Sequence, residues 1–202
     1  MREIVIPGEK LSDRRMRTGF GAYIKDGAVF SSVYGIPEHT KGFIRVVPLK
    51  GKYIPHEGDH VIGIVKDVKY RGCFVDINSP YVGYLPLNND EDYDIGDILL
   101  IRVAEVSSVN EVMLAEPKKL YDGKLVEIQP VKIPRVIGKR ASMLRILREA
   151  GNCIIFVGRN GRVFVKGDTN DVKKVEEALR MIEEEAHTYG LTARVKKFLE
   201  GG

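Results

Sequence analysis

The sequence contains no tryptophan and only two cysteines, Cys73 and Cys153, in 202 residues. Each cysteine lies in an apolar segment that reads as a strand, and the two segments belong to what we interpret below as different modules. This usage predicts buried, reduced thiols and no structural disulfide, as in the cytoplasm. We therefore expect a cytoplasmic protein.

Long hydrophobic runs are also missing. No apolar stretch approaches the roughly 20 residues that a membrane-spanning helix needs. The N-terminus, MREIVIPGEKL, does not carry the pattern of a signal peptide. With 44% hydrophobic and 30% charged residues, the composition is that of an ordinary globular protein, and we expect no membrane partner.

No pattern of catalytic residues stands out. His39, His56, His60 and His187 are scattered, and no serine or cysteine nucleophile has an evident partner. The acidic stretch NNDEDYD at residues 88–94 lacks the spaced ligands and the glycine of a calcium loop, and predicts a solvated loop that repels RNA. We expect no enzyme activity, cofactor or metal. A ribonuclease that uses the carboxylates of residues 90–97 stays open as an alternative.

Charge is low overall but unevenly distributed. The net charge is +4. Residues 1–52 hold ten Lys and Arg against five Asp and Glu, residues 53–117 hold four against twelve, and residues 118–202 hold eighteen against eleven. The middle of the chain is therefore strongly acidic and the two ends are basic, which divides the sequence into three parts.

The stretch IPRVIGKRASMLRIL, residues 133–147, predicts a basic loop between two helices. Pro134 suits the first turn of a short helix, and Gly138 can end that helix. Ser142 is predicted to cap the second helix. Free backbone N–H groups at a helix start attract phosphate, so the loop is a candidate nucleic-acid contact. It resembles the GXXG loop of KH domains, with Ala141 in place of the second glycine.

The elements around this loop follow the order strand, helix, helix, strand, strand, helix, which is the type I KH topology. Strands are predicted at residues 124–133, 152–157 and 162–166, a long helix at 170–188 and a basic tail helix at 191–199. Gly158, Arg159, Asn160 and Gly161 join two of the strands, and Asn-Gly predicts a two-residue hairpin turn. We assign residues 118–202 to this KH module.

Residues 55–117 predict five short strands, at 60–68, 73–77, 81–85, 97–106 and 112–115, and therefore an OB-type barrel. The spacing GDHVIGIVKDVKYRGCFVDI, YVGYLPL and IGDILLIRVAEV resembles the S1 RNA-binding domain. Three of the four basic residues lie in the first hairpin with an aromatic residue, and we predict that they contact RNA: Lys66, Lys69, Arg71 and Tyr70. Phe74 and Tyr81 either extend this stacking surface or belong to the core.

Residues 1–54 predict a third, β-rich module. Strand-like segments at 4–6, 23–25, 28–34 and 43–48 are separated by glycine and proline, and Asp26-Gly27 predicts a hairpin turn. A basic loop with Arg14, Arg15 and Arg17 either meets phosphate or an acidic protein surface, or is simply solvated. Such short strands bury little apolar surface, so we expect this module to dock on a partner.

Together these features define a multidomain α+β protein that resembles the RNA exosome cap subunit of the ribosomal-RNA-processing-protein-4 family, in an archaeal form. The resemblance rests on GFGAYIKDGAVFSSVYG, GDHVIGIVKDV, VDINSPYVGYLP, PRVIGKRASM and the turn GRNG, which matches a GxNG signature of that family. It implies a non-catalytic subunit that sits as a trimeric cap on a hexameric ring of nuclease subunits. There it would guide single-stranded RNA into the pore for 3′-to-5′ degradation.

The resemblance also implies roles for individual residues. The arm and the KH module would grip the ring, and the barrels would line its entrance. Lys66, Lys69, Tyr70 and Arg71 would face RNA, with secondary contacts from Arg135, Gly138, Lys139 and Arg140. The alternative is a transcription-elongation factor of the Nus class, which also places an S1-type barrel before KH units but is expected to carry a second KH unit of the other topology.

Overall fold

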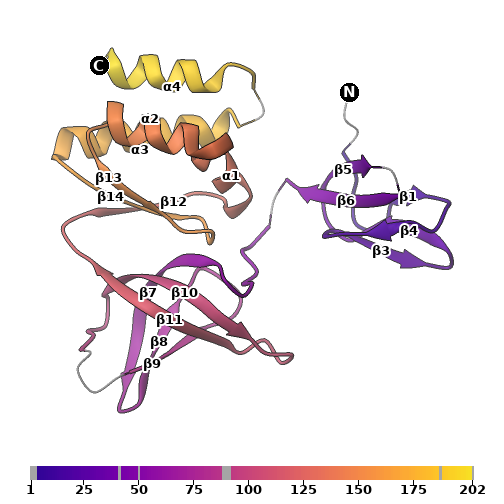
Figure 1. Cartoon of the computed structure of the whole chain (residues 1–202), viewed down its shortest axis with the longest axis horizontal. Coiled ribbons are helices and arrows are strands. Elements are labelled where there is room, and N and C mark those ends of the chain that lie inside the picture. The colour runs from indigo at the N-terminus through magenta and orange to yellow at the C-terminus, as the bar shows by residue number, and fades with distance from the viewer. Residues whose placement is uncertain (1–3, 41, 50, 88–91, 187, 202) are drawn as a thin grey trace. The chain divides into compact units, whose positions relative to one another are not determined.

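The computed structural model describes residues 4–40, 42–49, 51–87, 92–186 and 188–201. They form two compact units, Met1–Gly51 and Lys52–Gly202, in a multidomain α+β fold (Figure 1). Residues 88–91 of the predicted acidic loop, and His187, lie outside the described part. Within the described part, none of the helices has the length and apolar character that a bilayer crossing requires. The module boundaries at 54/55 and 117/118 stay predictions.

The N-terminal unit contains two three-stranded sheets, in the orders β1-β4-β3 and β2-β6-β5. Asp26 and Gly27 connect β3 to β4, both with positive φ, so the predicted hairpin turn is confirmed. The prediction missed β1, β2 and β5. The strands are Lys10–Ser12 (β1), Arg17–Thr18 (β2), Ala22–Lys25 (β3), Ala28–Ser31 (β4), Gly35–Thr40 (β5) and Phe43–Pro48 (β6).

A closed five-stranded barrel follows, as predicted, with the order β10-β11-β9-β8-β7. Its interior is filled by the apolar side chains that alternate along the strands, including Val65, Val75 and Leu99. Cys73 is buried in this core. The strands are His60–Lys69 (β7), Gly72–Asp76 (β8), Gly83–Pro86 (β9), Ile98–Val106 (β10) and Val112–Leu120 (β11).

Strand β11 continues past the predicted end at residue 115. The register against β10 shifts between Ala115↔Arg102 and Lys118↔Leu100, and Glu116 has a φ of +55°. This β-bulge accommodates Pro117, which has no backbone N–H to donate to the ladder. The sequence prediction ended the strand before the proline and missed the bulge.

The C-terminal elements form a type I KH fold with the antiparallel sheet β12-β14-β13. Helices cover one face of this sheet, and α4 packs on α2 and α3 (Figure 1). Cys153 is buried in this second core, apart from Cys73. The elements are Lys124–Glu127 (β12), Ile133–Ile137 (α1), Ser142–Ala150 (α2), Ile154–Val157 (β13), Arg162–Lys166 (β14), Thr169–Glu184 (α3) and Leu191–Glu200 (α4).

Two local predictions in this module are wrong. Strand β12 ends at Glu127 instead of residue 133, because Pro130 cannot extend the ladder and begins a 3₁₀ turn, Pro130–Lys132. Ser142 does not cap α2: Ala141 occupies the cap position, and no side chain caps the helix.

The other face of the KH sheet packs on the outside of the barrel. Phe164 of β14 is buried in one cluster with Ile62 of β7 and Leu120 at the end of β11. Leu125 and Phe156 of the sheet pack against the same cluster. The sheet therefore lies between its own helices and the barrel, which explains why both modules belong to a single compact unit.

Candidate nucleic-acid interface

The predicted barrel site is a tight hairpin. Lys69 pairs with Gly72 across β7 and β8, so Tyr70 and Arg71 form the turn. Tyr70 is 98% exposed. An aromatic ring that projects almost completely into water, beside cationic side chains, is suited to stacking on an unpaired base.

A row of apolar side chains extends from this hairpin across the outer barrel face. Phe74 pairs with Tyr84, which in turn pairs with Met113 of β11. The rings of Phe74 and Tyr84 are 5.5 Å apart, and Phe74 is 38% exposed. Tyr84 donates a hydrogen bond to the carbonyl oxygen of Arg71 at 3.0 Å, which ties the turn to the row. Oligonucleotides bind this face and the adjoining first loop in many OB folds.

Sequence reasoning missed Tyr84, although period-two alternation carried the signal. Gly83 and Leu85 are buried, so the side chain between them must face outward. Tyr81 behaves differently, because it packs against the barrel core. Of the two open aromatic candidates, Phe74 therefore extends the surface and Tyr81 is structural.

The cations of the hairpin are not equivalent. Lys69 forms an ion pair with Asp67 at 2.8 Å, with both side chains largely exposed. Lys66 and Arg71 are exposed, and neither lies within ion-pair distance of a carboxylate in the described part of the chain. They are the hairpin charges most available to a phosphate.

The loop between α1 and α2, residues 138–141, has an unusual backbone and is called the KH loop below. Gly138 has φ +74°, Arg140 +52° and Ala141 +58°. Gly138 ends α1, as predicted, and the left-handed residues after it hold Lys139 and Arg140 exposed at the start of α2. Arg135 is exposed on α1. Arg135, Lys139 and Arg140 likewise have no ion-pair partner among the described residues.

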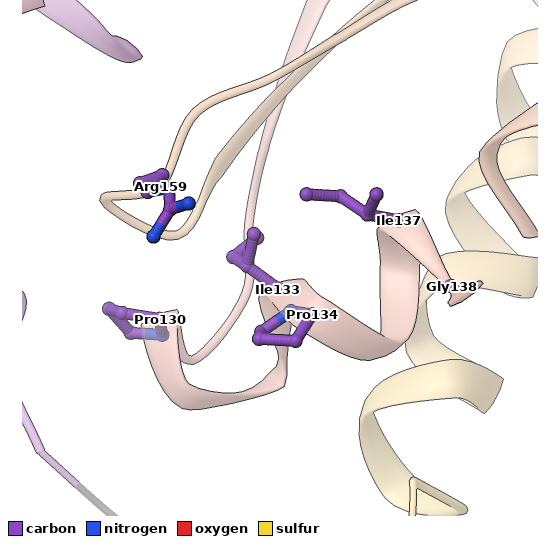
Figure 2. A pocket seen from close by; sticks show the side chains of 6 residues that line it. All are labelled: Pro130, Ile133, Pro134, Ile137, Gly138 and Arg159. Carbon is purple, nitrogen blue, oxygen red and sulfur yellow. The ribbon is translucent and has the colours of Figure 1, made fainter. Parts of the chain in front are cut away.

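A pocket of about 280 Å³ lies beside this loop (Figure 2). Gly138 forms its end at the KH loop. Arg159 contributes the opposite wall from the turn between β13 and β14, so the loop and the turn share one cavity. Sequence reasoning named Gly138 and Arg159 but did not place them together. The pocket is lined by Pro130, Ile133, Pro134, Ile137, Gly138 and Arg159.

Gly158 and Asn160 of the Gly158-Arg159-Asn160-Gly161 turn pack against the barrel. Asn160 is fully buried and donates to the carbonyl oxygens of Ile62 at 2.7 Å and Ile77 at 2.9 Å. Its side-chain oxygen accepts the backbone N–H of Ile62 at 3.2 Å. Gly158 must lack a side chain, because a Cβ there would lie 2.7 Å from the backbone nitrogen of Ile62.

This turn corrects the hairpin prediction. Strand β13 ends at Val157 and β14 begins at Arg162, so the connection contains four residues, 158–161, instead of two. The backbone N–H of Gly158 donates to the carbonyl oxygen of Arg162 across this connection. Gly161 has positive φ, but Asn160 does not. The asparagine is explained by its side-chain contacts across the module interface and not by turn geometry.

Arg162 adds an ionic contact to the same interface. Its guanidinium is almost fully buried, 2.9 Å from the Asp76 carboxylate and 3.0 Å from that of Glu127. Burial alone would raise the pKa of Asp76. The hydrogen bonds from Arg162 and from the backbone N–H of Asn78, together with the positive charges of Arg162 and Lys66, outweigh burial and hold that pKa below its usual value.

Comparison with known proteins agrees with this architecture. A family model described as the N-terminal domain of the exosome RNA binding protein RRP4 matches residues 2–50, and a KH domain model matches residues 123–171. Exosome complex component Rrp4 of Methanothermus fervidus is 44% identical over 98% of this chain and 95% of its own length. The chain belongs to the Rrp4 family of exosome components.

Other Rrp4 proteins support this assignment. The Thermococcus kodakarensis protein is 37% identical over 98% of this chain and 85% of its own length. A crystal structure described provisionally as an exosome complex RNA-binding protein matches with a TM-score of 0.68 and 38% identity, and covers 75% of this chain and 97% of that one. The predicted archaeal Rrp4 resemblance is confirmed.

Proposed function

We propose that this Rrp4-family chain is a non-catalytic RNA-binding cap subunit of a cytoplasmic exosome. It docks on a hexameric ring of nuclease subunits, as one copy of a trimeric cap, and guides single-stranded RNA into the pore for 3′-to-5′ degradation. The observation that carries the proposal is the similarity over nearly the full chain to proteins described as exosome complex component Rrp4.

The hairpin of Lys66, Lys69, Tyr70 and Arg71 is the main RNA contact in this proposal. Two unpaired cations and an exposed aromatic ring lie next to the row of Phe74 and Tyr84. Phosphates would be attracted to the cations while bases stack along the row, a combination that tolerates any sequence. The acidic character of the remaining barrel would keep RNA at this edge.

The KH loop supplies a secondary contact through Arg135, Gly138, Lys139 and Arg140. Ala141 weakens this contact, because its methyl group occupies the position that is the second glycine in the GXXG loops of KH domains.

The carboxylates of residues 90–97 do not favour the alternative of a ribonuclease. Within the described part of residues 90–97, Asp97 forms an ion pair with Lys119 at 2.7 Å and accepts the backbone N–H of Asp94 at 2.8 Å.

Reconstitution on the purified nuclease ring tests docking and guidance separately. We expect the wild-type chain to bind the ring and to accelerate the shortening of single-stranded RNA. A variant with Lys66, Lys69 and Arg71 replaced by Glu should bind the ring as well as wild type but lose most of the acceleration. Its RNA capture should also depend less steeply on salt concentration, because fewer cations contact phosphates. Lys139→Glu should cost less. Equal losses at the two sites would contradict this ranking, and a chain that does not bind the ring would refute the docking.

A further inference from the structure

The outward face of the sheet β1-β4-β3, in the N-terminal unit, carries an aromatic pair. Tyr23 of β3 pairs directly with Phe30 of β4, and their rings are stacked with centroids 5.8 Å apart. Tyr23 is 39% exposed and Phe30 is half-buried. Val29 and Ser31, on either side of Phe30 in the chain, are buried, so strand alternation places the two rings on the face opposite the core of the unit.

Lysines lie on both sides of the aromatic pair. Lys10 of the edge strand β1 is directly opposite Phe30, and Lys25 follows Tyr23 by two residues on the other edge strand, β3, so all four side chains share one face. Lys10 forms an exposed ion pair with Asp13 at 2.9 Å. Lys25 is exposed and forms no ion pair with another described residue.

More positive charge gathers at one end of this sheet. Strand β1 runs antiparallel to β4, so its C-terminal end lies beside the Asp26-Gly27 turn that joins β3 to β4. Arg14 and Arg15 follow β1 at this end, and Lys25 precedes the turn. The N–H of Arg14 donates to Ser12 Oγ at 3.1 Å, which fixes the start of the loop. Both arginines are exposed and have no ion-pair partner in the described part of the chain.

The second sheet of the same unit, β2-β6-β5, differs in its charges. On its outward face Arg45 of β6 lies opposite Glu38 of β5 and forms an ion pair with it at 2.7 Å, so this cation is neutralised. The first sheet instead combines stacked rings with unpaired cations, in a segment where ten Lys and Arg outnumber five Asp and Glu. Aromatic rings stack on unpaired bases and cations attract phosphates, so single-stranded RNA complements this face.

We propose that the outward face of β1-β4-β3 binds single-stranded RNA, with bases stacked on Tyr23 and Phe30 and phosphates held by Lys25, Arg14 and Arg15. Aromatic side chains on an open sheet face stack two or three bases in the RRM, a sheet of different topology that shows the chemistry is sufficient. The inference rests on the proposed RNA-binding function and adds to it a contact on the N-terminal unit.

Binding of a labelled single-stranded oligoribonucleotide to the full chain tests this contact. Tyr23→Leu removes the exposed ring but keeps an apolar side chain, and should weaken binding about tenfold without changing the salt slope, the loss expected for one stacked base. Lys25→Gln should lower the slope of log affinity against log salt by roughly 0.7–1, because one phosphate contact is lost.

Two substitutions in the same unit are matched controls. Tyr34 is 40% exposed but lies between β4 and β5, outside the aromatic face, so Tyr34→Leu changes an equally exposed ring. Arg45→Gln changes the net charge as Lys25→Gln does, on the second sheet. Both controls should stay within about twofold of wild-type affinity.

A wild-type measurement removes any dependence on how the variants fold: RNA carrying photoreactive bases should crosslink to residues 22–30. The absence of such crosslinks, or affinities of Tyr23→Leu and Lys25→Gln equal to those of their controls, would overturn the inference. Unchanged RNA affinity with lost binding to the nuclease ring would also overturn it and make this face a protein contact. If only the triple Glu hairpin variant loses RNA binding, the proposed function survives and this inference falls. If the wild-type chain binds no RNA, both fall.

Discussion

Ala141 has a left-handed backbone, with φ +58° and ψ +24°, although it carries a Cβ. This conformation costs an L-residue roughly 1–2 kcal/mol, and glycine avoids the cost while it loses about 0.5–1 kcal/mol of chain entropy on folding. The cap position of α2 also accepts glycine better than alanine. The strain therefore lies at Ala141, the residue at which the KH loop differs from the GXXG sequence.

Replacement of Ala141 by Gly should raise the free energy of unfolding by about 0.5–1 kcal/mol, because it relieves this strain. Chemical denaturation measures the change. The matched control is Ala193→Gly, at an exposed position inside α4, where the same substitution should lower stability by about 1 kcal/mol. A loss of stability in both variants would show that Ala141 is not strained.

Asn160 carries the densest set of contacts between the two modules. Its replacement by Ala leaves the N–H and carbonyl of Ile62 and the carbonyl of Ile77 with fewer partners in a buried interface. We expect a loss of about 3 kcal/mol in the free energy of unfolding, since each buried polar group left unsatisfied costs about 1–3 kcal/mol. Asn170→Ala, at an exposed position, should change stability by less than about 0.5 kcal/mol in the same denaturation experiment. Similar effects of the two substitutions would refute the interface role.

At the residue scale, the sequence could predict which residues are exceptional but not what they contact. The Asn-Gly pair signals a turn from local rules, whereas the partner of Asn160 is 98 positions away. A local sequence pattern cannot predict a contact between residues so far apart in the chain. Tyr84 is the opposite case, because strand alternation alone places it on the outer face beside Phe74.

At the scale of elements, β8 and β14 are joined through the ion pair of Asp76 and Arg162. The pKa of Asp76 in the folded protein lies below its unfolded value of about 3.9, so the unfolded state binds a proton more readily as the pH falls. The contribution of Asp76 to stability is therefore complete well above pH 4 and decreases as the pH falls through 4 toward the folded pKa.

Comparison of wild type with Asp76→Asn should reveal this dependence. We expect the variant to be less stable at pH 7 by about 1–3 kcal/mol, because Arg162 loses a charged partner in a buried place. At pH 3 the gap should become smaller. Asp122→Asn, which alters an exposed ion pair with Lys166, should have little effect at either pH. A gap of equal size at pH 7 and pH 3 would contradict the assignment.

The elements themselves were largely predictable where periodicity is long enough to read. The barrel strands other than β11, together with α1, α2 and the tail helix α4, lie close to their predicted positions. The strands β1 and β2 have only three and two residues, too few for an alternating pattern. The two prolines caused opposite errors. At Pro117 the strand was predicted to end, but a β-bulge lets β11 continue. At Pro130 the strand was predicted to continue, but β12 ends before it.

At the scale of the molecule, the barrel and the KH fold act as one body, because a buried apolar cluster and the Asn160 and Arg162 contacts join them. The hairpin surface and the KH pocket are therefore held in fixed relation within Lys52–Gly202. This arrangement suits a subunit that guides a flexible strand. The three-part charge pattern of the sequence indicated separate modules but could not reveal that two of them share an interface.

Affinity purification from a native cell extract tests the central claim most directly. The tagged chain is recovered, the proteins bound to it are identified, and the eluate is incubated with labelled single-stranded RNA with and without phosphate. The account predicts that nuclease ring subunits copurify and that the RNA is shortened from its 3′ end only when phosphate is present. Recovery of RNA polymerase without ring subunits, as expected for an elongation factor of the Nus class, would contradict it.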